Sequence, residues 1–318
     1  ELTATPPAMS YSSLIKVGVP AGDLQYITNI PLNGQEFSPD QSVRIGLSVP
    51  INAFVDLKRA YIKFRINNKD TTNRISLDPS AGCAAVIRAM RIYDGSGGLL
   101  QECENYNALY ALMSDLSGSQ HAQSSLNMLN GNNETPFTAP VSGVGGTGTG
   151  DDTTRVLIPG SGSADFVHVP MGEFWNMSRL CPLGFASGIS TVELSLASVN
   201  LPFTFNNTVT SITGWTVSNF ELHLPIIRCG EEFNNSFRQM ISSGIPINIH
   251  SVGYSNSQQN IAASTTGTVD LTFSSRKRSV KSLVAIIRKN ADLSSLVVDS
   301  CGARKSCGIS SYAYSIGG

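Results

Sequence analysis

The stretch SVRIGLSVPINAFVDLKRAYIKFRI, residues 42–66, decides the fold class of this chain. Apolar side chains stand at every second position on either side of Pro50: Val43, Ile45, Leu47 and Val49, then Ile62, Phe64 and Ile66. A period of two places successive side chains on opposite faces of an extended chain, so one face is apolar and the other is polar. The stretch therefore predicts two half-buried strands joined by a turn.

The same signal returns along most of the chain. Alternation, or a short run that is apolar on both faces, predicts further strands at 85–93, 155–158, 166–170, 191–196, 219–226, 245–249, 269–273, 280–287 and 312–316. Two segments, 102–116 and 233–241, instead have the 3.6-residue period of a helix. Strands and helices do not alternate regularly, as they would in a parallel α/β protein. The sequence therefore predicts an all-β fold with short helices in the connections.

Composition divides the predicted strands into two blocks. Residues 1–38 mix Pro, Gly and Ser with isolated apolar positions, and we expect them to form an N-terminal arm. A first sandwich is expected over 39–204, with a long Gly-rich loop at 117–152. A second sandwich is expected over 205–318, because the stretch 200–214 is polar and the strand pattern then begins again. This second block ends before an eighth strand, so we expect it to be incomplete.

Charged side chains are scarce and balanced in this chain. Only 14% of the residues are Asp, Glu, Lys or Arg, where an average soluble domain has about 25%. The formal net charge is −1, whereas proteins that coat nucleic acid carry an excess of Lys and Arg. The centres of subunit interfaces are poor in charged residues. The composition therefore favours a protein that assembles with its neighbours and does not coat a genome.

The sequence has no pattern of a catalytic or metal site. The six cysteines are scattered without a C-x-x-C pair, and we expect them to be reduced apolar side chains: Cys83, Cys103, Cys181, Cys229, Cys301 and Cys307. No histidine adjoins a cysteine pair, and no G-x-S-x-G nucleophile elbow occurs. No apolar run approaches the roughly 20 residues that span a bilayer. We therefore predict no catalytic residues, no cofactor and no metal.

Four stretches resemble one protein family. They are 31–66, AAVIRAMRIYDGSGGLLQECENYNALYALMSDL at 84–116, WTVSNFELHLPIIRCGEEFNNSFRQM at 215–240 and RSVKSLVAIIRK at 278–289. The second stretch combines a strand, a Gly-rich turn and a helix with Glu-x-Tyr-Asn-x-Leu, and the third combines a strand with a short helix. In this order they resemble the double jelly-roll major capsid proteins of icosahedral DNA viruses, such as polinton-like viruses and virophages.

The resemblance implies a structural role in a virion. It implies two jelly-roll sandwiches in series, the double jelly roll, and no enzyme activity. A subunit of this kind forms homotrimers that tile with neighbouring capsomers into an icosahedral shell, together with penton and minor capsid proteins. It implies no specific nucleic-acid recognition, and it leaves the presence of an internal membrane open.

Two basic groups are candidate contact sites. Arg276, Lys277 and Arg278, with Lys281, form the densest positive run. They predict either an inner-surface contact with genome or membrane headgroups, or a solvated turn beside a strand. The second group lies on the polar face of the strand in 59–66 and predicts either a contact with acidic neighbours or a solvated strand face; its members are Lys58, Arg59, Lys63 and Arg65.

Two alternative functions stay open. Jelly rolls also occur in lectins, so the first alternative is a secreted or surface β-sandwich that binds carbohydrate or a receptor. The second is a single jelly-roll coat protein with a projection domain, which only one eight-stranded sandwich would favour. Assembly separates the first alternative from a capsid role, because a capsid subunit forms trimers and shells whereas a lectin stays a small oligomer.

Overall fold

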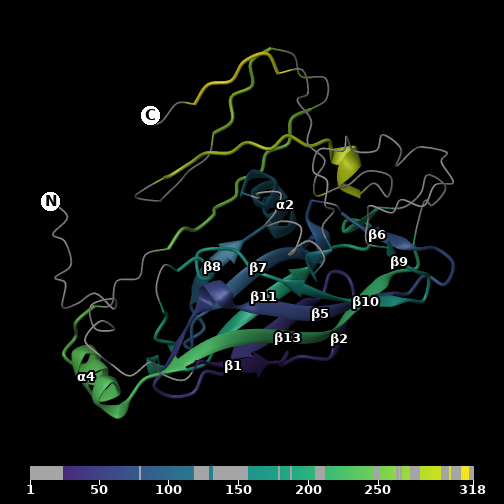
Figure 1. Cartoon of the computed structure of the whole chain (residues 1–318). Helices are drawn as coiled ribbons and strands as arrows, with labels where there is room; N and C mark the ends of the chain where they lie inside the picture. The colour runs from purple at the N-terminus through teal and green to yellow at the C-terminus, as the bar shows by residue number, and fades with distance from the viewer. Residues whose placement is uncertain are drawn as a thin grey trace.

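A computed structural model shows the chain as a sandwich of two antiparallel sheets (Figure 1). Helix α4 lies beyond one end of the sheets, and α2 lies over the sheet that contains β7 and β8. The structure describes residues 24–78, 80–117, 129–131, 157–177, 180–186, 188–204, 212–246, 251–262, 265, 267–272, 280–294, 301 and 309–314. The prediction of a mostly β fold with helices in the connections is confirmed.

Strands dominate the described residues. In chain order they are β1 Leu24–Asn29, β2 Glu36–Phe37, β3 Ser42–Leu47, β4 Ala53–Val55, β5 Tyr61–Asn68, β6 Ile75–Leu77, β7 Ile87–Tyr93, β8 Leu99–Cys103, β9 Leu157–Ile158, β10 Ser163–His168, β11 Ser190–Leu196, β12 Phe203–Thr204 and β13 Trp215–Arg228. The helices are α2 Tyr106–Ser117 and α4 Glu231–Ser242, with short 3₁₀ helices at Leu57–Arg59, Gly82–Val86, Leu183–Phe185 and Asn290–Ser294.

Eight of these strands have the connectivity of one complete jelly roll. Sheet A has the order β1-β13-β5-β10, and β2 and β4 also pair with β13. Sheet B has the order β3-β11-β7-β8. Eight strands make up these two orders: β1, β3, β5, β7, β8, β10, β11 and β13. In chain order they alternate between sheet A and sheet B, except that β7 and β8 form a hairpin within sheet B. This crossing of antiparallel strands between two facing sheets is the jelly-roll arrangement.

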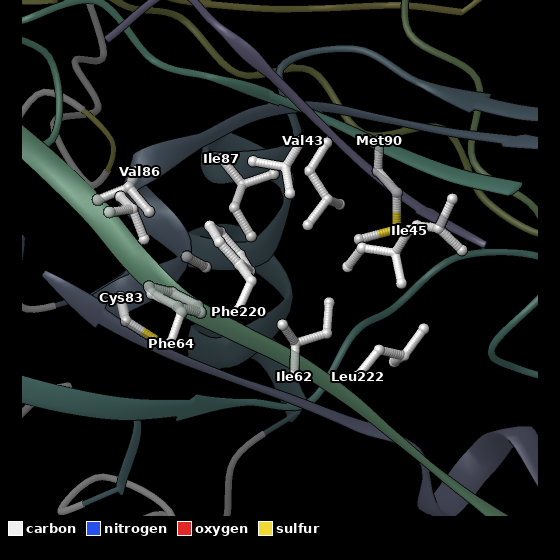
Figure 2. Close-up of a cluster of buried hydrophobic side chains, with 14 of the residues drawn as sticks. Val43, Ile45, Ile62, Phe64, Cys83, Val86, Ile87, Met90, Phe220 and Leu222 are labelled. Atoms are coloured by element: carbon white, nitrogen blue, oxygen red, sulfur yellow. The ribbon is translucent and has the colours of Figure 1, made fainter. Parts of the chain in front are cut away.

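The apolar faces of the two sheets meet in one core (Figure 2). Ile62 of β5 and Leu222 of β13 point towards Val43 and Ile45 of β3, and all four side chains are fully buried. Burying each such side chain stabilises the fold by about 1.5–3 kcal/mol relative to leaving it exposed. The alternation that predicted the strands therefore also identifies the residues of the core.

Strand β13 corrects the predicted domain boundary. The boundary at 204/205 places this strand in a second sandwich, but it lies in the middle of sheet A with β1 on one side and β5 on the other. A β-bulge at Asn219, where φ is 53°, shifts the register with β5 and lets both halves of the strand face the core. The polar stretch 200–214 is therefore a connection within the jelly roll and does not separate two sandwiches.

Residues 24–37 correct the predicted N-terminal arm. Strand β1 pairs with β13 along its whole length, from Leu24 opposite Ile227 to Asn29 opposite Leu222. The two-residue strand β2 also pairs with β13. Part of the arm predicted over 1–38 is therefore an edge of sheet A, and residues 1–23 lie outside the described residues.

Helix α2 connects the core to the predicted Gly-rich loop. It begins at Tyr106, later than predicted, because residues 99–103 form β8. Of the loop predicted at 117–152, the structure describes only residue 117 and residues 129–131. Asn130 is buried there, where it accepts a hydrogen bond from the Cys83 thiol and donates one to the Tyr110 hydroxyl at 3.1 Å. Asn130 therefore fixes this part of the loop against the jelly roll.

Helix α4 confirms the helix predicted at 233–241. Its first turn contains Glu231 and Glu232, whose negative charge is favourable at the positive end of the helix dipole. Phe237 is buried against Phe54 of β4, with ring centroids 5.1 Å apart. The helix ends before Gly244, whose φ of 74° suits glycine. An aromatic contact therefore holds α4 against the end of sheet A.

The described residues that follow α4 contain no β-strand. Strands predicted at 269–273 and 280–287 are absent from the described parts of these segments, where Leu271 and Val284 are more than half exposed. Alternation alone does not make a strand, because a strand also needs a neighbour whose backbone pairs with it. The second jelly roll predicted over 205–318 does not include β13, which belongs to sheet A, and it stays a prediction for the residues after that strand. No helix in the described ranges has the length and apolar character needed to cross a membrane.

Candidate assembly surface

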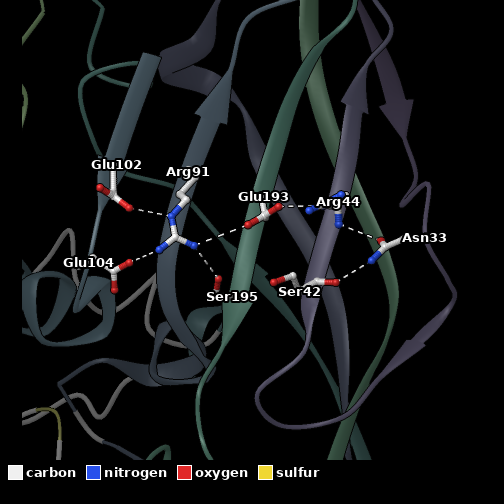
Figure 3. Close-up of polar contacts among 8 residues, drawn as sticks. All are labelled: Asn33, Ser42, Arg44, Arg91, Glu102, Glu104, Glu193 and Ser195. Carbon is white, nitrogen blue, oxygen red and sulfur yellow. Dashed lines mark hydrogen bonds and ion pairs between the residues drawn. The ribbon is translucent and has the colours of Figure 1, made fainter. Parts of the chain in front are cut away.

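A row of paired charges crosses the outer face of sheet B (Figure 3). Glu193 on β11 is in register with Arg44 on β3 and with Arg91 on β7. Arg44 Nε donates to Glu193 Oε2 at 2.8 Å, and Arg91 Nη1 lies 3.6 Å from Glu193 Oε1. Arg91 also donates to Glu102 at 2.8 Å and to Glu104. The hydrogen bond to Glu102 raises the pKa of Arg91, so this row is held together by a permanent positive charge.

We expect Arg91→Met to lower the free energy of unfolding by about 1–3 kcal/mol. The change leaves Glu102 and Glu104 without their arginine and weakens the pairing of Glu193, whose side chain is only 10% exposed. Urea denaturation of the purified variant measures the loss. The matched control is Arg44→Met, at a side chain that is 62% exposed, which should cost less than about 1 kcal/mol. Equal losses in the two variants would contradict this central role of Arg91.

The free edge of β3 is covered by the segment at residues 30–33. Pro31 forms a β-bridge with Ile45, and Leu32 N–H donates to Arg44 O at 2.7 Å. The side-chain amide of Asn33 then acts like a backbone amide, donating to Ser42 O at 2.7 Å and accepting from Arg44 N–H at 2.9 Å (Figure 3). An edge covered in this way does not recruit a strand from another molecule. Contacts at this side of the sandwich must therefore be made by side chains.

Exposed apolar side chains gather at one end of sheet B. Leu32 and Ile189 are 71% and 60% exposed, and both lie against Gly46 of β3. Residue 46 is in register with Thr191, which pairs with Tyr93, which in turn pairs with Leu99. Leu99 is 52% exposed at the far edge of the same row. We call Leu32, Ile189 and Leu99 the apolar rim; grouped exposed apolar side chains are typical of contact surfaces.

The outer face of sheet A is balanced in charge. Arg65 donates to both carboxylate oxygens of Asp165 at 2.8 Å, and Lys63 Nζ lies 3.8 Å from Glu221 Oε2. Two members of the basic group predicted from the sequence, Lys63 and Arg65, are therefore paired with acidic side chains on β13 and β10, and Arg59 Nε lies 3.4 Å from Asp56 Oδ2. This finding favours a solvated strand face over a binding site for acidic partners.

A buried histidine lies beneath α2. Burial lowers the pKa of His168 to about 3, so the ring is neutral. Met171 N–H donates to the Tyr106 hydroxyl at 3.0 Å, and this hydroxyl shares a hydrogen bond with His168 Nε2 at 2.7 Å. The other ring nitrogen, Nδ1, has no hydrogen-bond partner among the described residues. His168 is fully buried, so its role is in packing rather than in contact with a solute.

The predicted basic contact is mostly outside the described residues. Arg276, Lys277 and Arg278 are not described, and Lys281 is exposed. Their contact with genome or membrane headgroups therefore stays a prediction. In the described ranges, no three His, Cys, Asp or Glu side chains are grouped as a metal ion would need. The described cysteines are free thiols: Cys83, Cys103, Cys181, Cys229 and Cys301. Cys307 lies outside the described residues.

Two surface features were not predicted from the sequence: the apolar rim, and the neighbouring side chains of Tyr26 and Tyr61 on sheet A. The apolar rim combines residues from three separate loops and strand ends, so no local pattern reveals it. Tyr61 was predicted on the outer face of its strand by alternation. Tyr26 falls within the N-terminal arm predicted over 1–38, because β1 pairs with β13, a strand far along the chain. Tyr26 and Tyr61 come together only in the complete sheet A, where β1 and β5 both pair with β13.

Comparisons with known proteins give likenesses of structure. PBCV-1 VP54, fitted into a reconstruction of the virophage Sputnik, shares 12% identity with the chain over 69% of it and 45% of VP54, with a TM-score of 0.46. The Faustovirus major capsid protein shares 8% identity over 73% of this chain and 60% of its own, with a TM-score of 0.44. A chain of the Sputnik virophage structure shares 10% identity over 67% and 49%, with a TM-score of 0.41.

The chain spans about half the length of these solved structures. No protein-family model and no curated protein matches its sequence.

Proposed function

We propose that the chain is a structural subunit of a viral capsid shell and not an enzyme. Eight antiparallel strands form one complete jelly roll, an arrangement used in viral capsids and in lectins. The fold alone therefore leaves both roles open. The observation that favours a shell is the apolar rim, which lies next to a covered sheet edge and a row of charges that are already paired.

The apolar rim has the chemistry of a contact between copies of this chain. Interface centres are apolar and poor in charge, and fully burying one Leu or Ile side chain stabilises a contact by about 1.5–3 kcal/mol. The covered edge of β3 prevents growth by strand pairing at that side, so the rim joins subunits there through side chains. We propose that the assembled unit is a homotrimer, located in the virion shell beside neighbouring capsomers and penton and minor capsid proteins.

The native mass of the purified protein tests the proposal. With a chain mass of 33.8 kDa, light scattering should give three times that mass, about 101 kDa, and negative-stain images should show these particles tiling into sheets or shells. A stable monomer or dimer that never assembles would contradict the capsid function. It would favour the lectin-like alternative.

We expect the double variant Leu32→Asp, Ile189→Asp to be folded but monomeric. Burying two carboxylates at the centre of a contact costs several kcal/mol, whereas both side chains are exposed within the single chain. Light scattering measures the mass, and circular dichroism checks the fold. The control is Leu116→Asp, at an exposed leucine on α2, which should assemble like the wild type. Assembly of the double variant would show that the rim is not the contact.

A further inference from the structure

Three rings form a row on the outer face of sheet A. Tyr61 of β5 and His223 of β13 are opposite each other, and their rings stack with centroids 4.6 Å apart and planes 14° apart. The ring of Tyr26, on β1, is centred 6.3 Å from that of Tyr61. Tyr26 is 53% exposed, so the row is open to solvent. We call these three residues the aromatic platform.

Hydrogen bonds fix the orientation of the histidine. His223 Nε2 is 3.0 Å from Glu221 Oε2, and a carboxylate oxygen only accepts, so Nε2 carries the proton and donates it. In the neutral ring Nδ1 is then an acceptor, and the Thr28 hydroxyl donates to it at 3.2 Å. The platform is therefore ordered before any ligand arrives, which lowers the entropy cost of binding.

Two pairs of oppositely charged side chains lie on the same face of sheet A as the platform. Lys63 pairs with Glu221, and Arg65 pairs with Asp165. A charged ligand would have to compete with one of these pairs, whereas an uncharged ligand leaves them intact. Among the described residues, Glu221 Oε1 and the hydroxyls of Tyr26 and Tyr61 have no hydrogen-bond partner. These groups remain available to a ligand rich in hydroxyls.

We propose that the aromatic platform binds a neutral carbohydrate. A sugar ring has faces of C–H groups and an edge of hydroxyl groups. The C–H faces stack on the exposed ring of Tyr26, because His223 already covers one face of the Tyr61 ring; tyrosine rings offer large apolar area at a low entropy cost. The hydroxyl edge donates to Glu221 Oε1 and exchanges hydrogen bonds with the tyrosine hydroxyls. This activity goes beyond the proposed shell role, because it gives the subunit a surface that attaches to glycans.

A second copy of the chain is the competing occupant. Leu24 is half-exposed on the same face as Tyr26 and would suit a protein contact. The platform nevertheless lies among paired charges and hydroxyls, whereas the large apolar side chains of sheet B gather at the apolar rim. The observations therefore favour a polar ligand with apolar faces over a protein surface.

The test uses the full-length protein on an array of neutral oligosaccharides of glucose, galactose, mannose, fucose and N-acetylglucosamine, with sialylated and sulfated ones for comparison. We expect binding to at least one neutral glycan, confirmed by titration in solution. Tyr26→Ala should weaken it at least about tenfold. Tyr26→Phe keeps the stacking ring and loses only the hydroxyl, so it should weaken binding less than Tyr26→Ala does. Tyr314→Ala removes an equally exposed tyrosine elsewhere and should stay within about twofold of the wild type.

Three results would overturn the proposal. They are the absence of binding to every neutral glycan, binding to charged glycans alone, and equal affinity of the wild type and Tyr26→Ala. Light scattering of Tyr26→Ala distinguishes a glycan from a second copy of the chain as the occupant of the platform. A fall in native mass in this variant alone would assign the platform to a subunit contact. A wild type that fails to assemble but binds a neutral glycan would contradict the shell role and leave this inference standing.

Discussion

Residues 24–204 produced alone will not fold, whereas residues 24–246 will unfold in one cooperative transition. The shorter fragment lacks β13, the strand between β1 and β5 in sheet A. Six large apolar side chains of β13 are at most 2% exposed: Trp215, Val217, Phe220, Leu222, Leu224 and Ile226. At about 1.5–3 kcal/mol each, their burial is comparable with the whole free energy of unfolding of a domain, about 5–15 kcal/mol.

Circular dichroism and urea denaturation of the two fragments give the measurement. The longer fragment keeps all eight strands of the jelly roll and α4, so it is the matched control for the shorter one. A folded 24–204 fragment would restore the boundary predicted from composition at 204/205. Failure of both fragments would show that residues 1–23 or residues after 246 are also needed for the jelly roll to fold.

We expect the free energy of unfolding to fall by about 2 kcal/mol between pH 7 and pH 5 because of His168. Its folded pKa is lowered to about 3 by burial, whereas an unfolded histidine has a pKa of about 6.5. Below that value the unfolded chain binds a proton that the folded chain refuses, so acid favours unfolding. The stability contributed by the neutral ring is therefore complete above pH 6.5 and is lost progressively as the pH falls towards 3.

Urea denaturation at pH 7, 6 and 5 measures this slope in the wild type and in His168→Gln. The variant should show a flatter dependence on pH, whatever its absolute stability. Hydrogen bonds from the backbone of Asn73 and Thr72 lower the pKa of Asp70 to about 2. The contribution of Asp70 to the free energy of unfolding is therefore lost below the range of pH 7 to 5. Identical slopes for wild type and His168→Gln would contradict the assignment.

Local periodicity predicted the strands that have one face buried in the core and the other face at the surface. The strands expected in 43–49, 60–66 and 191–196 correspond to β3, β5 and β11 within a few residues, because each has one face on the core. Periodicity also predicted α4, since Phe233 and Phe237 lie on one helix face. These elements have a pattern that comes from their own side chains.

Pairing between distant segments was not predictable in this way. Strand β1 is largely exposed, and only Asn29 is buried, so its sequence has no clear apolar face. The polar stretch 200–214 has the composition of a linker, but a surface loop within one domain has the same composition. The aromatic platform and the apolar rim depend on these pairings, so neither could be derived from a single stretch.

The place of β13 in sheet A has a consequence for synthesis. Leu24 pairs with Ile227, 203 residues further along the chain. During translation β1 and β5 leave the ribosome long before the strand that joins them, so sheet A cannot close until β13 emerges. Contacts between such distant segments fold slowly, and open strand edges in a nascent chain attract other chains. Production of this protein should therefore depend on chaperones until residue 228 has left the ribosome.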